Sequence, residues 1–140
     1  MDVAFLDANV LFSAAYRPTA ILRGLWDLTG TRLVTSVYAA EEARRNLRTP
    51  RQREDLATLL DAIDVGAARF PAEHPVFTTI RLPERDRPIL LAAIHARATH
   101  LLTGDIDHFG AYFEQRIAGI LIQLPAVYLR ARRSEEERRE

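Results

Sequence analysis

The sequence predicts an α/β fold, namely a three-layer α/β/α sandwich in which helices cover both faces of a central, mostly parallel sheet. Short apolar runs alternate with helical segments along the 140 residues, and this alternation is typical of parallel sheets with helical crossovers. About half of the residues (48%) are hydrophobic, which is enough to form a core. The length indicates a single domain, which we assign to residues 1–133; a charged tail, 134–140, is expected to fray.

The first elements are a strand and a helix. Residues 3–6 are a short apolar run that predicts a buried strand. A helix is predicted over about 18–28, because Pro18 suits a first helical turn and Gly30 suits a C-terminal cap.

A second strand and two helices follow. Residues 32–35 predict the strand, and Ser36 is placed to cap a helix that runs to about residue 48. Pro50 suits the start of the next helix, predicted over about 51–63 from apolar residues at helical spacing.

The pattern is least regular over residues 64–83, where only 76–80 suggest an extended segment. Asp86 is placed to cap an apolar helix that runs to about residue 98. The remaining predictions, in chain order, are a strand over 100–103, a short helix over 107–115, a strand over 117–123 and a last helix that begins at Pro125.

The composition excludes several kinds of chemistry. The chain has no cysteine, so disulfides, thiol nucleophiles and cysteine zinc sites are impossible. It also has no lysine, which excludes a P-loop lysine, a Schiff base, a receiver domain and a phosphoaspartyl phosphatase of the usual kind. The net charge of zero argues against strong nonspecific binding to nucleic acid. No apolar run is long enough for a membrane span, and we expect a cytoplasmic protein.

Carboxylates mark the places where the predicted elements begin or end. Asp7 and Asp105 directly follow apolar runs, and Glu42 and Asp86 lie in or at the start of helices. Right-handed crossovers place the carboxyl ends of parallel strands on one edge, where ligands bind. Acids gathered there repel one another unless a cation lies between them, and a hard divalent metal ion is the simplest candidate.

Most of these acids also have a structural interpretation. Asp86 alone would be explained as a helix N-cap, and Asp105 or Asp107 can cap the helix that follows them. The local turn after Asp7 could hold its carboxylate. His108 lies near this acidic turn and could reach a substrate, although the four histidines show no metal-ligand spacing.

A helical segment carries both acids and arginines. Glu41 or Glu42 can form a surface ion pair with Arg44 or Arg45. The arginines can equally bind a phosphate backbone, because a guanidinium grips phosphate with two hydrogen bonds, but a solvated helix face explains such a cluster at least as well.

Taken in order, these segments resemble the PIN domain family, in particular the bacterial VapC-like toxins. The resemblance covers most of the chain and depends on the order and spacing of several segments. They are Phe5-Leu6-Asp7-Ala8-Asn9-Val10-Leu11, Glu42-Ala43-Arg44-Arg45-Asn46-Leu47, Asp86-Arg87-Pro88-Ile89-Leu90-Leu91-Ala92-Ala93, Leu101-Leu102-Thr103-Gly104-Asp105-Ile106-Asp107-His108-Phe109 and Pro125-Ala126-Val127-Tyr128-Leu129. The match is weakest over residues 64–83.

The resemblance implies an endoribonuclease that hydrolyses RNA phosphodiester bonds with Mg²⁺ or Mn²⁺. The acidic positions of the family correspond to Asp7, Glu42, Asp86 and Asp105. We prefer Glu42 to Glu41 because the following Arg-Asn-Leu segment aligns with it.

The resemblance also assigns accompanying roles. The metal ligands would be Asp7, Asp86 and Asp105, with Asp107 as an extra ligand, and Glu42 would serve a second ion or its water. Asn9 and Thr103 match positions that support the site, and Arg44 and Arg45 would contact the substrate.

Partners follow from the same resemblance. A toxin of a type II toxin–antitoxin pair would be blocked by a cognate antitoxin protein, and such toxins usually form homodimers. The alternative is a noncatalytic PIN-like module that binds RNA or a protein.

Overall fold

The fold consists of one sheet with helices on both sides. The computed structural model describes residues 1–67 and 73–139. Within these ranges the strands are β1 (Asp2–Leu6), β2 (Thr31–Ser36), β3 (Asp64–Gly66), β4 (His100–Leu102), β5 (Arg116–Ile117) and β6 (Ile120–Gln123). The α-helices are α1 (Ala8–Tyr16), α2 (Val37–Asn46), α3 (Pro50–Asp61), α4 (Arg87–His95), α5 (Ile106–Phe109) and α6 (Pro125–Arg139).

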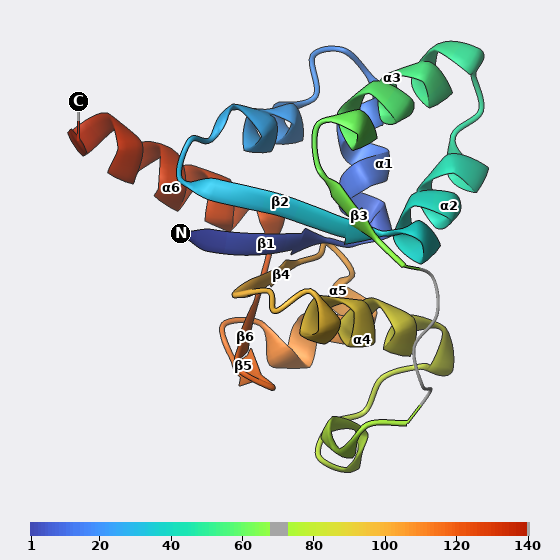
Figure 1. Cartoon of the computed structure of the whole chain (residues 1–140), viewed down its shortest axis with the longest axis vertical. Coiled ribbons are helices and arrows are strands. Elements are labelled where there is room, and N and C mark those ends of the chain that lie inside the picture. Colours follow the sequence, from blue (N-terminus) through green and yellow to red (C-terminus); the bar gives the residue numbers. More distant parts are fainter. Residues whose placement is uncertain (68–72, 140) are drawn as a thin grey trace.

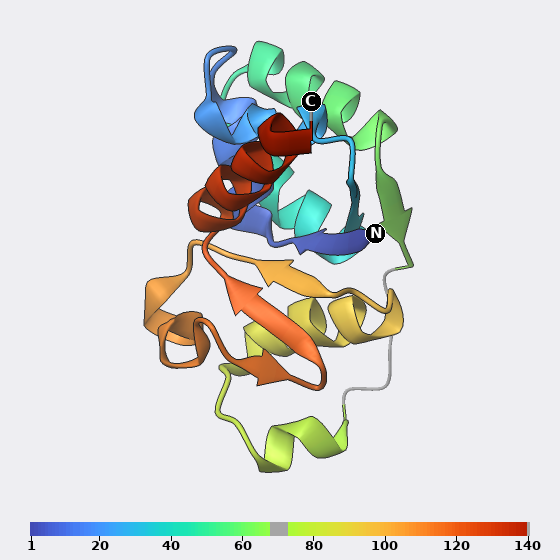
Figure 2. The same ribbon diagram turned by 90° about the vertical axis from the view of Figure 1, so that its left-hand side faces the viewer.

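The sheet has the strand order β3-β2-β1-β4-β6-β5. All neighbouring pairs are parallel except β5 and β6, which are antiparallel. Helices α1, α2 and α3 pack together on one side of the sheet and α4 lies on the other. Figure 2 shows the same layers from a perpendicular direction. This arrangement confirms the predicted α/β/α sandwich with a mostly parallel sheet.

The core is centred on β1 and β4. Ala4, Phe5 and Leu6 have no exposed surface, and Leu101 and Leu102 beside them are equally buried. Strands that are covered on both faces consist of continuous apolar residues, which is why both runs could be recognised in the sequence. Because these two strands are neighbours, the residues that follow them meet at the carboxyl edge of the sheet.

Side-chain caps fix the starts of two predicted helices. Ser36 Oγ accepts a hydrogen bond from the Ala39 N–H at 3.2 Å, which begins α2 as expected. Thr49 and Gln52 form a capping box in front of α3, with Pro50 in its first turn.

The helix predicted over 18–28 is present in a shorter form and as a different type of helix. An unpredicted helix, α1, begins directly after Asp7, whose side chain accepts from the first helical N–H, and ends before Pro18. Proline disfavours helical backbone in the residue before it, so α1 cannot continue through Pro18. The later residues Ile21–Asp27 form a 3₁₀ helix.

Two predicted extended segments are also corrected. Pro75–Thr78 is a 3₁₀ helix, begun by the His74 side chain, which accepts from the Val76 N–H. The predicted strand over 117–123 is a hairpin, β5–β6. Ala118 (φ 51°) and Gly119 (φ 80°) form its two-residue turn, and positive φ at both positions suits a tight antiparallel turn.

Other boundaries differ by shorter amounts. The apolar helix α4 ends at His95 rather than at residue 98, and Arg97 then has φ 56°. The helix predicted over 107–115 is α5 followed by a 3₁₀ turn, Gly110–Tyr112. Residues 64–83 contain the edge strand β3, which was not predicted, and residues 68–72 lie outside the described ranges.

The C-terminal helix α6 begins at Pro125, as predicted, and continues into the charged tail as far as Arg139. The Glu136 carboxylate accepts hydrogen bonds from the Thr29 N–H (3.1 Å) and hydroxyl (3.0 Å), which holds the last turns against the body of the protein. No helix within the described ranges combines the length and apolar character needed to cross a bilayer.

Tyr128 anchors α6 to the amino ends of β1 and β2. Its buried hydroxyl donates to Asp2 Oδ2 at 2.8 Å and contacts Thr31 Oγ1 at 2.7 Å. We expect Tyr128→Phe to lower the free energy of unfolding by about 1–2 kcal/mol, because these bonds cannot be replaced. Urea unfolding measures this effect. Tyr16→Phe, at a half-exposed residue, is the control and should change little; equal losses in both variants would contradict the anchoring role.

Candidate metal centre

Asp7 is held at the junction of β1 and β4. Its N–H donates to the Leu102 carbonyl oxygen at 3.1 Å, and its side chain is buried (4% exposed). The Oδ1 atom accepts from the Ala8 N–H at 2.7 Å, so Asp7 also caps α1. The local-turn role considered for this residue is confirmed, and it is compatible with a site role, because Oδ1 caps the helix while Oδ2 points away from the cap.

Asn9 and Thr103 surround the other oxygen of Asp7. The Thr103 hydroxyl donates to Asp7 Oδ2 at 2.7 Å, and Asn9 Nδ2 donates to the same atom at 3.2 Å. Asn9 Oδ1 accepts from the Gly104 N–H at 2.8 Å, which ties α1 to the turn after β4. Thr103 Oγ1 also accepts from the Asp105 N–H at 3.1 Å. These contacts fix the direction of the Asp7 carboxylate relative to Asp105.

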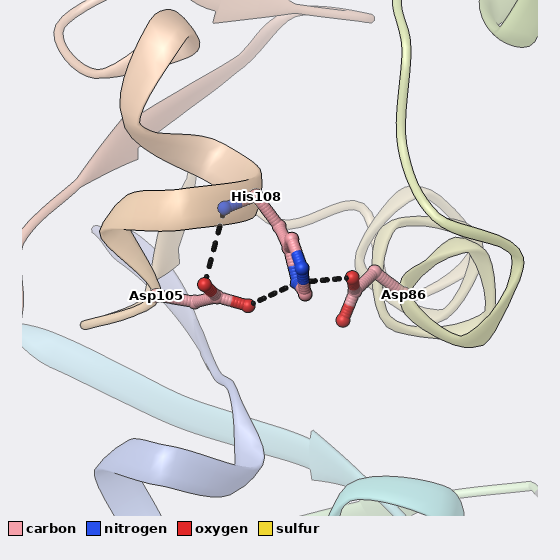
Figure 3. Close-up of side chains that lie close together, drawn as sticks. All are labelled: Asp86, Asp105 and His108. Carbon is pink, nitrogen blue, oxygen red and sulfur yellow. Dashed lines mark hydrogen bonds and ion pairs between the residues drawn. The ribbon is translucent and has the colours of Figure 1, made fainter.

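Asp86, Asp105 and His108 form a second cluster at the same edge (Figure 3). The His108 Nδ1 atom lies 2.8 Å from Asp86 Oδ2 and 2.8 Å from Asp105 Oδ2. One potential ligand atom from each residue lies within 4.8 Å of the others. Asp86 comes from the start of α4, whereas Asp105 and His108 come from the turn and helix after β4.

Asp105 caps a helix with its side chain, whereas Asp86 does not. Asp105 Oδ1 accepts from the His108 N–H at 3.1 Å and caps α5, while Oδ2 remains directed at the imidazole. Asp86 occupies the N-cap position of α4, yet its side chain makes no capping hydrogen bond. Its helical backbone, with φ −94° and ψ −13°, departs from the extended conformation usual for a capping residue. The carboxylate faces His108 instead.

The environment of Asp7 opposes its ionisation. Burial raises the pKa of the Asp7 carboxyl from 3.8 to about 6, against the opposing effects of the hydrogen bonds from Thr103 and Ala8. Repulsion from Glu42 and Asp86 raises it further, which places both carboxylates in the electrostatic environment of Asp7.

Burial also raises the pKa of the Asp86 carboxyl. His108 partly offsets this increase in pKa, and repulsion from Asp105 adds to it. Acids whose ionised forms are disfavoured in this way are candidates for a functional site, and a cation would stabilise their charged forms.

The two neighbouring glutamates differ in exposure. Glu42 is partly buried and interacts with Asp7 and Tyr38, whereas Glu41 is exposed. Tyr38 lies at the rim, and its hydroxyl donates to the Arg85 carbonyl oxygen at 2.6 Å. Arg44 and Arg45 are exposed on α2 and remain candidates for substrate contact.

Asp107 is placed less favourably than the other predicted ligands. It is exposed in the first turn of α5 and does not belong to the group around His108. His108 is the residue that the sequence did not single out as a ligand. Its position three residues after Asp105 at a helix start places both side chains on the same side, and that spacing was the available signal.

The donor set fits a divalent cation. Asp86 Oδ2 and His108 Nδ1 are shielded from solvent, and neither finds a partner with hydrogen-bond geometry among the described residues, despite their short separation. Carboxylate oxygens suit Mg²⁺ and Mn²⁺, and an imidazole nitrogen adds a ligand typical of transition metals. Such an ion would satisfy both atoms and relieve the repulsion among the acids.

Solved structures provide likenesses, although no family model and no curated protein matches the sequence. VapBC2 from Rickettsia felis, bound to a promoter DNA fragment, matches 87% of this chain and 98% of its own with a TM-score of 0.57 and 14% identity. The structure of FitAB bound to an IR36 DNA fragment matches over 87% of this chain and 94% of that chain, with a TM-score of 0.59 and 18% identity. The structure of FitAcB from Neisseria gonorrhoeae matches over 88% of this chain and 98% of that chain, with a TM-score of 0.52 and 18% identity.

These matches span nearly the whole of the compared chains, so they concern the complete arrangement of elements rather than a local motif. At such low identity they bear on the fold alone. The chain has the PIN-like, VapC-like fold that its sequence resemblance predicted.

Proposed function

We propose that the protein is a divalent-metal-dependent endoribonuclease that hydrolyses RNA phosphodiester bonds, and that it is the toxin of a type II toxin–antitoxin pair. One observation carries the proposal: the acids predicted from the sequence gather with His108 at the carboxyl edge of a PIN-like sheet. That edge is where α/β folds bind their ligands.

The residues present would hold Mg²⁺ or Mn²⁺ through Asp86, Asp105 and His108, with Asp7 beside them. When bound, such an ion activates water and neutralises charge on a phosphodiester. Glu42 would bind or orient a second ion or a metal-bound water. Asp107 remains a proposed extra ligand.

The protein's own groups have defined tasks in this proposal. Thr103 and Asn9 hold Asp7 in one orientation through their hydrogen bonds. Because burial disfavours the Asp7 carboxylate, a nearby cation would stabilise its charged form, which couples the ionisation of this residue to metal binding. Arg44 and Arg45 are exposed and would guide the phosphate backbone.

The direct test is cleavage of structured and single-stranded RNA by the purified chain, with Mg²⁺ or Mn²⁺ added and then chelated. We expect cutting that appears with the metal and stops with the chelator. A chain that binds RNA or a protein but never cuts would instead be the noncatalytic module considered as the alternative.

The toxin assignment adds a protein partner. We propose that a cognate antitoxin covers the acidic edge and that the chain forms a homodimer. Co-expression with the product of the adjacent gene should inhibit cleavage, and light scattering of the isolated chain should give twice the monomer mass.

Metal binding should be detectable without turnover. At 100 times its dissociation constant, Mn²⁺ is expected to stabilise the protein by about 2.7 kcal/mol, since an ion that binds only the folded state shifts the unfolding equilibrium. Thermal unfolding measures this effect. His108→Gln, which removes the imidazole, should need a higher Mn²⁺ concentration for the same shift. Identical titrations for the two proteins would contradict ligation by His108.

A further inference from the structure

A cavity of about 680 Å³ adjoins the metal centre between α1, α2 and the start of α3. Asn9 and Glu42, which belong to the metal centre, form one end of it, and the remaining wall comes mainly from residues that the proposed chemistry does not use. The cavity therefore opens directly beside the place where a phosphodiester would be cut.

Two aromatic rings form one wall. Phe12 and Tyr16 are four residues apart on α1 and so lie on one face of it. Their ring centroids are 5.4 Å apart at an interplanar angle of 41°. Tyr16 is 49% exposed and Phe12 is partly buried. A half-exposed aromatic pair beside a cavity is suited to stacking with a planar group.

Polar side chains from the end of α2 and from the segment that leads into α3 also line the cavity. The side chains of Asn46 and Arg48 are exposed, and neither makes a hydrogen bond or ion pair with the residues that the structure describes. Gln52 differs from them, because it accepts from the Arg48 and Thr49 N–H groups and donates to the Tyr16 carbonyl oxygen. Gln52 thus fixes the wall, and Asn46 and Arg48 remain available to a ligand.

We propose that this cavity binds one base of single-stranded RNA next to the scissile phosphate. The base would stack on the half-exposed Tyr16 ring, and Phe12, whose ring is tilted by 41° from that of Tyr16, would contact the base edge. The Asn46 amide would bond to the base, and Arg48 would contact the adjoining phosphate. Its position beside the scissile bond rests on the proposed nuclease function. The aromatic wall, the exposed Arg48 guanidinium and the end shared with Glu42 favour a nucleotide, because a nucleotide supplies a planar base and a phosphate at adjoining positions.

The test measures RNA binding without cleavage. A fluorescently labelled single-stranded RNA is titrated with the Asp7→Asn protein, and the dissociation constant is compared after adding Tyr16→Leu or Arg48→Gln. Arg130→Gln, at an exposed arginine of α6, is the matched control. We expect each cavity substitution to weaken binding about 10-fold, in line with the contribution of a stacked base, and the control to leave binding unchanged.

An abasic oligonucleotide separates the base from the backbone. It should bind the Asp7→Asn protein about as weakly as intact RNA binds after Tyr16→Leu. Unchanged RNA affinity in both cavity variants would overturn the inference. The inference would also be overturned if Tyr16→Leu weakened the binding of a protein partner but left the dissociation constant for RNA unchanged. The base site and the nuclease function can fail separately. If the parent never cuts RNA with any metal but its RNA binding still depends on Tyr16, the proposed nuclease function is wrong and the base site stands.

Discussion

In metal-free buffer at pH 8, Asp7→Asn is expected to raise the free energy of unfolding by about 2 kcal/mol. Burial raises the pKa of Asp7 from 3.8 to about 6, so folding disfavours the charged form of this residue. That shift corresponds to about 3 kcal/mol at neutral pH. The substitution removes the charge, but it also replaces Oδ2, which accepts hydrogen bonds from Thr103 and Asn9, by an NH2 group. The loss of these bonds reduces the gain.

The sign of the effect depends on pH. Below pH 4 the carboxyl is protonated in both the folded and the unfolded state, so Asp7 imposes no ionisation penalty. Between pH 4 and 6 the folded state holds the proton more tightly, and the stability of the parent falls as the pH rises. Above pH 6 the carboxyl is ionised in both states, and the full free-energy cost of burying the charged form remains.

Urea unfolding of the parent and Asp7→Asn at pH 4 and pH 8, with chelator present, measures this difference. The advantage of the variant should be large at pH 8 and nearly absent at pH 4. Asp107→Asn, at an exposed carboxylate, is the control for a general change in charge. An advantage of the same size at both pH values would contradict the buried, repelled state of Asp7.

Asp105→Asn is expected to lower the rate of metal-dependent RNA cleavage by at least about 100-fold, which is the upper range for the loss of a residue that only supports a metal site. Asparagine can still accept from the His108 N–H, the bond that begins α5, so the fold should survive. What it loses is the negative charge that faces His108 and Asp86.

Asp107→Asn is the informative comparison, because it makes the same change two residues away. Cleavage rates for both variants, measured at saturating metal, give the contribution of each carboxylate. A small loss at Asp107 would restrict the site to the residues around His108, whereas equal losses would make Asp107 a ligand as well. Full activity in Asp105→Asn would contradict the proposed centre.

The parts of the fold that follow from local sequence signals were predictable. Leu101 and Leu102 lie in a continuous apolar run, and Ser36 and Pro50 mark helix starts, so these elements were predicted nearly in place. The helix α1 was missed because Asp7 was considered for chemistry and for a local turn, but not as a helix cap. The β5–β6 hairpin was missed because its turn requires positive φ at Ala118, which is uncommon for a residue other than glycine.

The candidate site shows the same division between local and long-range information. Asp7 and Asp105 could be paired from the sequence because both lie just after the carboxyl ends of predicted parallel strands, which are neighbours in the sheet. His108 contacts Asp86, a residue 22 positions earlier, only through tertiary packing. The cavity beside the site also depends on how α1, α2 and α3 pack together, which no local pattern specifies.

The measurement that tests the central claim most directly is RNA cleavage by the parent and by Asp7→Asn, prepared identically, with Mn²⁺ added and then chelated. The account predicts cleavage by the parent alone, which stops with the chelator, while Asp7→Asn remains folded and inactive. Equal cleavage by both proteins, or cleavage that persists in the chelator, would contradict a metal-dependent nuclease at this site.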